Sequence, residues 1–220
     1  MTDASFQKER EERERVHNLS VNTDYYAERE MSYSQLVNHL LSKYGSSKAD
    51  YFTDERCIKA NPRAKRSGEG LICHHIDEDK VADLSKGEIA KKHLFEYQKA
   101  PRLVYCNLLE HLLLHVKITI EIPHNSDLKG LGAGGVVNYM CKDFNHFYSG
   151  KQFGMDFVVY QVNQMEAVEP ENHFDEYVAI MRDLYKYFQE DPLWKDVPAA
   201  YLSRDRDDEV VDVVYQALIK

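Results

Sequence analysis

Two pairs of histidines lie close together in the sequence between residues 70 and 122. His74 and His75 are adjacent and end a short apolar run, whereas His111 and His115 are four residues apart in a leucine-rich segment. Neutral imidazole, with an ordinary pKa of about 6.5, accepts protons near neutral pH and binds divalent metal ions. If the chain doubles back between the two pairs, four imidazoles come within reach of one point.

The segment that carries the second pair is predicted to be a helix. Its apolar residues recur at the i, i+3, i+4 and i+7 spacing of a buried face, at Leu109, Leu112, Leu113, Val116 and Ile120. His111 and His115 share a second stripe, because residues four apart lie one above the other on a helix. Residues 103–106 follow a turn at Pro101 and are partly β-branched or aromatic, so they predict a strand. The expected order is strand, long loop, strand and helix.

This order resembles the HNH (His-Me finger, or ββα-metal) nuclease family. The likeness rests on His-His-Ile at the first strand and on Glu-His-x-x-x-His in the helix, and it covers roughly a quarter of the chain. It implies that His75 is the general base for water, and that His74, His111 and His115 hold one divalent metal ion. The activity it implies is hydrolysis of phosphodiester bonds in nucleic acid, with DNA expected before RNA.

The identity of the metal ion is a separate expectation. Such an ion would act as a Lewis acid on the scissile phosphate and neutralise charge on the 3′ oxygen. Mg²⁺ or Mn²⁺ is expected because these ions are the usual partners of nucleases, whereas imidazole ligands favour Zn²⁺ or Ni²⁺. The sequence leaves both choices open.

One position departs from the family pattern. The asparagine that orients the base histidine in relatives normally opens the second strand, and Arg102 stands at that place. Asn107 lies nearby but only four residues before His111. Two further candidate catalytic residues follow: Arg102, because it stands at the position of the family's asparagine, and Asn107, because it is an asparagine nearby.

An acidic triplet follows the His-His-Ile sequence directly. Asp77, Glu78 and Asp79 predict a solvated acidic turn. The alternative is that Asp77 or Asp79 adds a carboxylate to a hard cation such as Mg²⁺.

Two other functions compete with a nuclease. One is an inactive HNH-like module that binds nucleic acid or a protein partner, which the Arg102 departure favours. The other is a helical protein whose histidines hold structural zinc near Cys73 and Cys106. The sequence contains no C-x-x-C pair, the usual mark of a closed structural site, and this counts against zinc. The intact His74–His75 pair favours the enzyme.

The charge of the chain restricts how it binds nucleic acid. A formal net charge of −9 is unlike that of a general nucleic-acid coat protein, which is usually basic. One run without an acid precedes the His-His-Ile sequence. Its phosphate contacts would lie beside the scissile bond, and its cations are Lys59, Arg63, Lys65 and Arg66.

Composition sets the fold class and the compartment. With 220 residues, 43% of them hydrophobic, the chain is long enough for a sizeable core. No stretch is apolar enough to cross a membrane, and the charged N-terminus lacks the apolar segment of a secretory signal. A cytoplasmic protein with no membrane partner is expected, and its four cysteines are expected to be reduced thiols.

The expected fold is α+β and mainly α, with a ββα-metal hairpin-and-helix inside a helical frame. Residues 1–31 form a charged arm or helix, 32–122 the HNH-like unit with a preceding helix that Ser32 or Ser34 caps, and 123–220 a helical C-terminal part. Gly130, Gly132 and Gly135 match the dinucleotide spacing G-x-G-x-x-G, but no strand precedes them, so they predict a glycine loop leading into a helix. Residues 155–165 are ambiguous, and helices are expected at 174–188 and 210–218.

Overall fold

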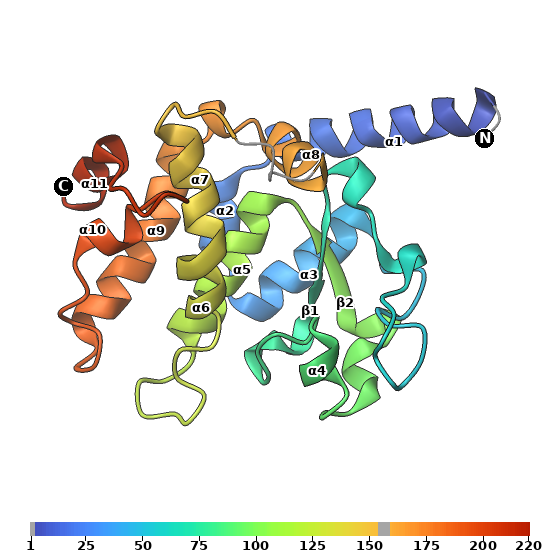
Figure 1. The fold of residues 1–220 in the computed structure, drawn as a ribbon, viewed down its shortest axis with the longest axis horizontal. Coiled ribbons are helices and arrows are strands. Elements are labelled where there is room, and N and C mark those ends of the chain that lie inside the picture. The colour runs from blue at the N-terminus through green and yellow to red at the C-terminus, as the bar shows by residue number, and fades with distance from the viewer. Residues whose placement is uncertain (1–2, 154–158) are drawn as a thin grey trace.

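The computed structural model describes residues 3–153 and 159–220, and it is mainly helical around one small sheet (Figure 1). This confirms the mainly α, α+β class. Helices α1 and α11 lie at opposite ends of the molecule. The elements are α1 Asp3–Val21, α2 Tyr25–Arg29, α3 Tyr33–Tyr44, β1 Ile72–His75, α4 Gly87–Ala90, β2 Leu103–Cys106, α5 Leu108–Glu121, α6 Ala133–Gly135, α7 Cys141–Tyr148, α8 Val159–Val168, α9 Phe174–Glu190, α10 Ala199–Leu202 and α11 Asp212–Leu218.

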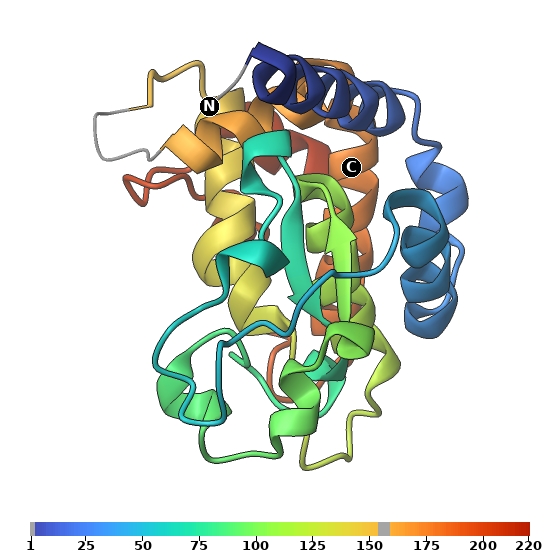
Figure 2. The same ribbon diagram turned by 90° about the vertical axis from the view of Figure 1, so that its right-hand side faces the viewer.

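The two strands form an antiparallel pair, and they run side by side in Figure 2. His74 lies opposite Val104, and His75 lies opposite Leu103. Because successive side chains of a strand point to opposite faces, the two adjacent histidines face different surroundings. The predicted order of strand, long loop, strand and helix is confirmed.

Side-chain caps fix where α3 and α5 begin. Ser32 accepts from the backbone N–H of Gln35, whose side chain accepts in return from the Ser32 N–H. Asn107 and Glu110 form the same reciprocal capping box at the start of α5, which satisfies two backbone donors that a helix start leaves free. Helix α3 ends at Gly45, where φ is +79°. The expected cap at Ser32 is confirmed.

One hydrophobic cluster joins the N-terminal helices, the sheet and the C-terminal helices. It contains Leu36 and Leu40 of α3, Leu112 of α5, Leu184 of α9 and Leu218 of α11, all buried. The helices expected near 174–188 and 210–218 are present as α9 and α11. Of the ambiguous segment 155–165, residues 155–158 lie outside the described residues and 159–165 belong to α8. Within the described ranges, no helix is long and apolar enough to cross a membrane.

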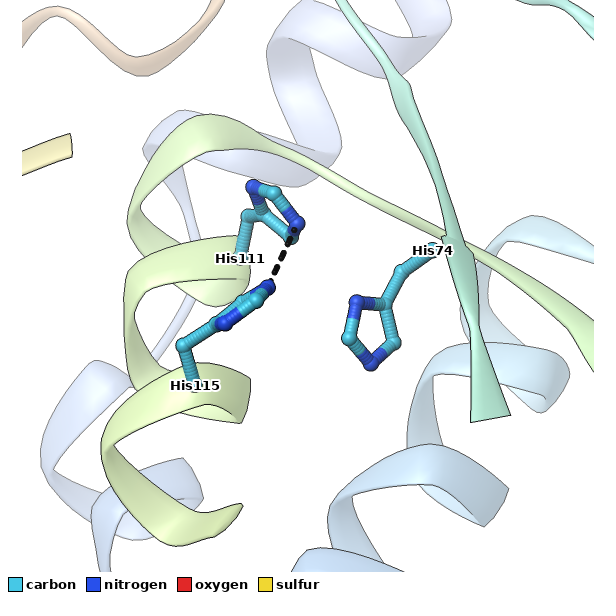
Figure 3. Close-up of side chains that lie close together, drawn as sticks. All are labelled: His74, His111 and His115. Carbon is cyan, nitrogen blue, oxygen red and sulfur yellow. Dashed lines mark hydrogen bonds between the residues drawn. The ribbon is translucent and has the colours of Figure 1, made fainter. Parts of the chain in front are cut away.

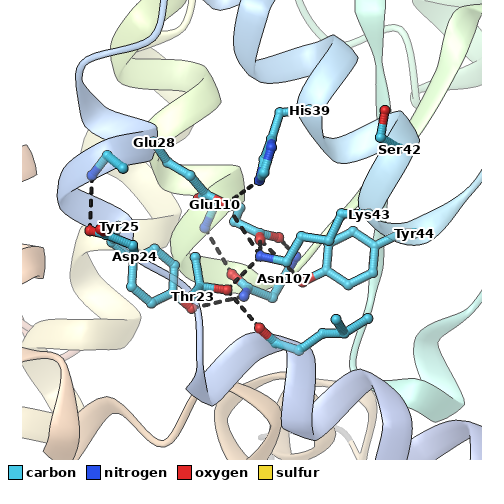
Figure 4. A network of polar contacts seen from close by, with 12 residues as sticks. Thr23, Asp24, Tyr25, Glu28, His39, Ser42, Lys43, Tyr44, Asn107 and Glu110 are labelled. Carbon is cyan, nitrogen blue, oxygen red and sulfur yellow. Dashed lines mark hydrogen bonds and ion pairs between the residues drawn. The ribbon is translucent and has the colours of Figure 1, made fainter.

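A buried polar network ties α2, α3 and α5 together (Figure 4). The ammonium of Lys43 lies 3.2 Å from a Glu28 carboxylate oxygen and 2.5 Å from one of Glu110. Tyr44 donates to the same Glu110 oxygen at 3.1 Å. One cation thus serves two buried carboxylates. Burial, followed by the charge of Glu110, raises the pKa of Glu28 to about 8.

Glu28→Gln is expected to make stability less dependent on pH. The folded protein holds a proton on Glu28 that the unfolded chain releases near its ordinary pKa of 4.5. The free energy of unfolding therefore falls as pH rises from the ordinary pKa to the raised one. The glutamine variant lacks this loss and should exceed the wild type by on the order of 3 kcal/mol at pH 9. Urea unfolding at several pH values measures the effect, with Lys43, His39, Asp24 and Glu110 unchanged around the site. Parallel pH profiles for the two proteins would contradict it.

Candidate metal centre

Three of the four histidines converge between β1 and α5. Figure 3 shows the ring of His74 on β1 facing the rings of His111 and His115 on α5. One nitrogen from each ring lies within 4.8 Å of the other two. The Nε2 atoms of His111 and His115 are 3.2 Å apart, as the i, i+4 spacing on one helix face allows. The structure thus brings together the three side chains expected to bind metal.

Tyr33 determines which nitrogen of His74 carries the proton. The Tyr33 hydroxyl donates its proton to the Ile76 carbonyl at 2.8 Å, so its oxygen accepts at 3.0 Å from His74 Nε2. His74 Nδ1 then holds a lone pair, and it is buried without a hydrogen-bond partner. Burial of the ring, followed by the nearby His115, lowers the pKa of His74 well below its ordinary value. His74 is therefore a neutral imidazole with a free lone pair.

His74 faces two further imidazoles, those of His111 and His115 (Figure 3). Burial also lowers the pKa of His111 well below its ordinary value, with His115 as the second cause, so His111 is neutral too. Buried nitrogens that find no donor cost free energy unless a cation or proton satisfies them. Three imidazoles whose nitrogens converge on one point are the donor set that a divalent transition ion prefers. These residues fit a metal ion.

Glu78 is the residue of this site that the sequence did not identify. It lies in the 3₁₀ turn Ile76–Asp79 directly after β1. One carboxylate oxygen is 3.3 Å from His115 Nε2 and 3.6 Å from His74 Nδ1. The prediction of a solvated acidic turn is wrong, because Asp77 and Glu78 are both buried. A signal was present in the sequence, since Glu78 lies four residues after His74.

Arg102 holds the acidic turn in place. Its guanidinium forms two hydrogen bonds with the carboxylate of Asp77, and Lys80 binds the same carboxylate at 2.7 Å. Burial raises the pKa of Asp77, but Arg102 and Lys80 outweigh it, so the pKa lies below the ordinary value. Asp77 is thus ionised and paired with two cations. Through this pairing Arg102 holds the acidic turn against the hairpin.

His75 lies on the other face of β1 and is held by an amide. Gln98 donates through its side-chain nitrogen to the Leu84 carbonyl at 3.2 Å, so its oxygen accepts from His75 Nε2 at 2.8 Å. The proton of His75 is therefore on Nε2, and Nδ1 is the basic nitrogen. Burial lowers the pKa of His75, against the smaller opposing effects of Glu78 and Gln98. The Tyr51 ring packs against the imidazole at 4.4 Å between centroids.

Asn107 has a structural position in this fold. It is fully buried, caps α5 and donates to the Tyr25 hydroxyl at 2.8 Å. The amide that contacts His75 is Gln98, nine residues earlier in the sequence. Neither Arg102 nor Asn107 is among the hydrogen-bond partners found for His75 in the described part of the chain.

The glycine segment packs tightly on α5 beside the histidines. A Cβ at Gly132 would lie 2.3 Å from the His115 carbonyl oxygen, and one at Gly135 would lie 2.9 Å from His115 Nδ1. Only glycine allows the backbone to approach this closely. The segment leads into α6 and α7, which confirms the predicted glycine loop followed by a helix. A cleft of about 850 Å³ lies here, lined by this segment and by all four histidines.

The four basic residues predicted to bind nucleic acid differ in exposure. Three of them, Lys59, Arg63 and Lys65, are exposed. Arg66 is half-buried and pairs with Glu12 at 2.8 Å and Glu69 at 2.5 Å. The structure therefore leaves three of these cations on the surface and uses the fourth to join α1 to the segment before β1.

The cysteines do not join the histidine cluster. All four are free thiols, as expected. Burial raises the pKa of Cys73 to about 12 and that of Cys106 well above its ordinary value, and neither thiol belongs to the group of converging histidine nitrogens. A second group, His146, Asp205 and Asp207, already surrounds an ammonium, because Lys151 lies 2.5 Å from Asp205 and 3.0 Å from Asp207.

His111→Ala is expected to weaken metal binding strongly, by more than about 100-fold. The reason is that His111 supplies one of the three converging nitrogens. His93→Ala is the matched control, since His93 is exposed in the turn after α4. Calorimetric titration of the apoprotein with Zn²⁺ measures both affinities. Equal affinities for the two variants would remove His111 from the site.

Comparisons with known proteins give no match: no family model, no curated protein and no solved structure is significantly similar to this chain.

Proposed function

We propose that this protein is a divalent-metal-dependent endonuclease of the HNH type, acting on DNA in preference to RNA. The observation that carries the proposal is the convergence of His74 from β1 with His111 and His115 from α5, next to a second histidine on the opposite face of the same strand. A hairpin followed by a helix with this set of residues is the arrangement that the sequence resemblance implies. The fit of the donor set to a metal ion supports it.

Four histidines and one glutamine take part in the proposed reaction. His74, His111 and His115 hold the ion, which when bound supplies Lewis acidity at the phosphate. His75 takes a proton from the attacking water at Nδ1, and its lowered pKa keeps it neutral near pH 7. Gln98 fixes the His75 ring and the site of its proton. Gln98 thereby does for His75 what the family's asparagine does for the base.

The exposed cations supply the contact to the nucleic acid backbone. Lys59, Arg63 and Lys65 are exposed and precede β1 in the chain. Lysine and arginine on phosphates supply most nonspecific affinity, which decreases with salt. This gives an acidic protein a local surface for a polyanion.

A binding module without activity is the second candidate. The observation in its favour is Glu78, whose carboxylate contacts two of the three histidines. Four protein ligands around one ion are typical of closed, structural sites. The module would keep metal binding and lose cleavage.

The test is metal-dependent nicking of supercoiled plasmid by the purified protein. The reactions contain chelator alone or Mg²⁺, Mn²⁺, Ni²⁺ or Zn²⁺. Nicking that needs metal, and that His111→Ala loses while His93→Ala keeps it, is the expected result. A protein that binds metal tightly but leaves the plasmid and a matched RNA intact with every ion would overturn the enzyme and favour the binding module.

A further inference from the structure

Glu78 and the three histidines form a group of four acceptors with too few protons. His74 Nδ1 carries a lone pair, since its proton is on Nε2 toward Tyr33. His115 Nε2 lies 3.2 Å from His111 Nε2 and 3.3 Å from the Glu78 carboxylate. A single proton on His115 Nε2 can be donated to only one of these two neighbours. His74 Nδ1 still faces the Glu78 carboxylate at 3.6 Å, with no proton between the two acceptors. A cation held by the three converging nitrogens would satisfy His74 Nδ1 and would attract the carboxylate that lies within 3.6 Å of two of them.

Three of the six separations within this group can be compared with the edges of a coordination polyhedron. Ligands at the usual zinc distances of about 2.0–2.1 Å in tetrahedral geometry are separated by about 3.3–3.4 Å. Neighbouring ligands in the octahedral geometry of Mg²⁺, at similar distances, are separated by about 2.9 Å. The three contacts here are 3.2, 3.3 and 3.6 Å. These lengths lie closer to the tetrahedral separation than to the octahedral one.

We propose that Glu78 is the fourth ligand of this centre, so that the resting site is a closed His₃Glu site that selects Zn²⁺-class ions over Mg²⁺. At rest the carboxylate then occupies the position that a substrate phosphate needs, so a phosphodiester must displace Glu78 from the ion before it can be cleaved. This second part rests on the proposed function, whereas the role of Glu78 as a ligand does not.

The fold holds Glu78 at this place through the neighbouring residue. Asp77 is fully buried and is bound by Lys80 and by Arg102, which directly precedes β2. The 3₁₀ turn Ile76–Asp79 is thus anchored to the hairpin through the residue next to Glu78. Among the described residues no lysine or arginine lies within ion-pair distance of Glu78, whose partners are His74 and His115. A buried carboxylate in that state is a ligand for an ion.

The experiment is titration of the apoprotein with Co²⁺, which absorbs visible light strongly in four-coordinate sites and weakly in six-coordinate ones. The proteins are the wild type, Glu78→Gln and the control Glu88→Gln, whose glutamate is 82% exposed and pairs with Lys91. The wild type and the control are expected to give the same strong absorption, and Mg²⁺ in excess should not displace Co²⁺. Glu78→Gln should bind Co²⁺ at least about tenfold more weakly, with an altered spectrum.

Two results would overturn the proposal: an unchanged affinity and spectrum in Glu78→Gln, or weak six-coordinate absorption in the wild type. Glu78→Asp keeps the carboxylate but places it on a shorter side chain, farther from the histidines. This variant gives a second measure if the glutamine variant does not fold. Inorganic phosphate then tests closure, because it should perturb the Co²⁺ spectrum of Glu78→Gln and leave that of the wild type unchanged. Absence of plasmid nicking would count against the proposed function alone, since none of these spectra depends on activity.

Discussion

His75→Ala is expected to reduce metal-dependent plasmid nicking by on the order of 10²–10⁴-fold, the usual effect of removing a general base. His75 lies on the face of β1 opposite to His74, and its contacts are Gln98 and Tyr51. Zn²⁺ affinity should therefore stay within a few-fold of the wild type, as the rate falls. Single-turnover nicking rates and calorimetric affinities measure the two effects separately.

Two further variants make this expectation specific. Gln98→Glu keeps an acceptor for the proton on Nε2 and adds a negative charge, which favours imidazolium and raises the pKa of His75. The acidic limb of the pH–rate profile should move upward in this variant. His93→Ala should match the wild type throughout. Wild-type rates in His75→Ala would show that another group takes the proton.

Lys43→Met is expected to lower the free energy of unfolding by about 3–5 kcal/mol, the usual cost of leaving a buried charge without its partner. Lys43 is the cation between Glu28 and Glu110, and Glu110 is fully buried. Methionine keeps much of the side-chain length and removes the charge together with the hydrogen bonds that the ammonium donates. Denaturant unfolding at pH 7 measures the loss.

A matched lysine on the surface gives the control for this loss. Lys91 pairs with the exposed Glu88, so Lys91→Met should change stability by less than about 0.5 kcal/mol. Adding Glu110→Gln to Lys43→Met should restore part of the stability, because the uncompensated charge is then removed. If Lys43→Met and Lys91→Met were equally stable, the network would not contribute to stability.

The elements that carry the three histidines could be predicted from local sequence. The i, i+4 spacing of His111 and His115 fixes their common face once α5 forms, and the apolar residues of α5 make that helix evident. Strand β2 could be predicted from residues 103–106, because β-branched and aromatic residues after a turn favour a strand. These signals are local, so a single sequence contains them.

The partners that come from the long loop could not be predicted. Gln98 reaches His75 across 23 positions, and Arg102 reaches Asp77 across 25. Both contacts depend on the path by which residues 76–102 return to the hairpin. A loop of this kind has no helix or strand periodicity from which its path could be predicted. The prediction of a solvated acidic turn is wrong for the same reason, since Arg102, which forms two hydrogen bonds with Asp77, lies at the far end of that loop.

The glycine segment beside His115 has a consequence for mutational tolerance. At Gly134 an added Cβ would meet only the Asn138 amide at 3.8 Å, whereas at Gly132 and Gly135 it would collide with α5. A saturation library selected for folded, metal-binding protein should therefore accept many residues at position 134 and almost none at positions 132 and 135. In this chain two of the three glycines that match a nucleotide-binding loop, Gly132 and Gly135, are needed for close packing against α5 and His115.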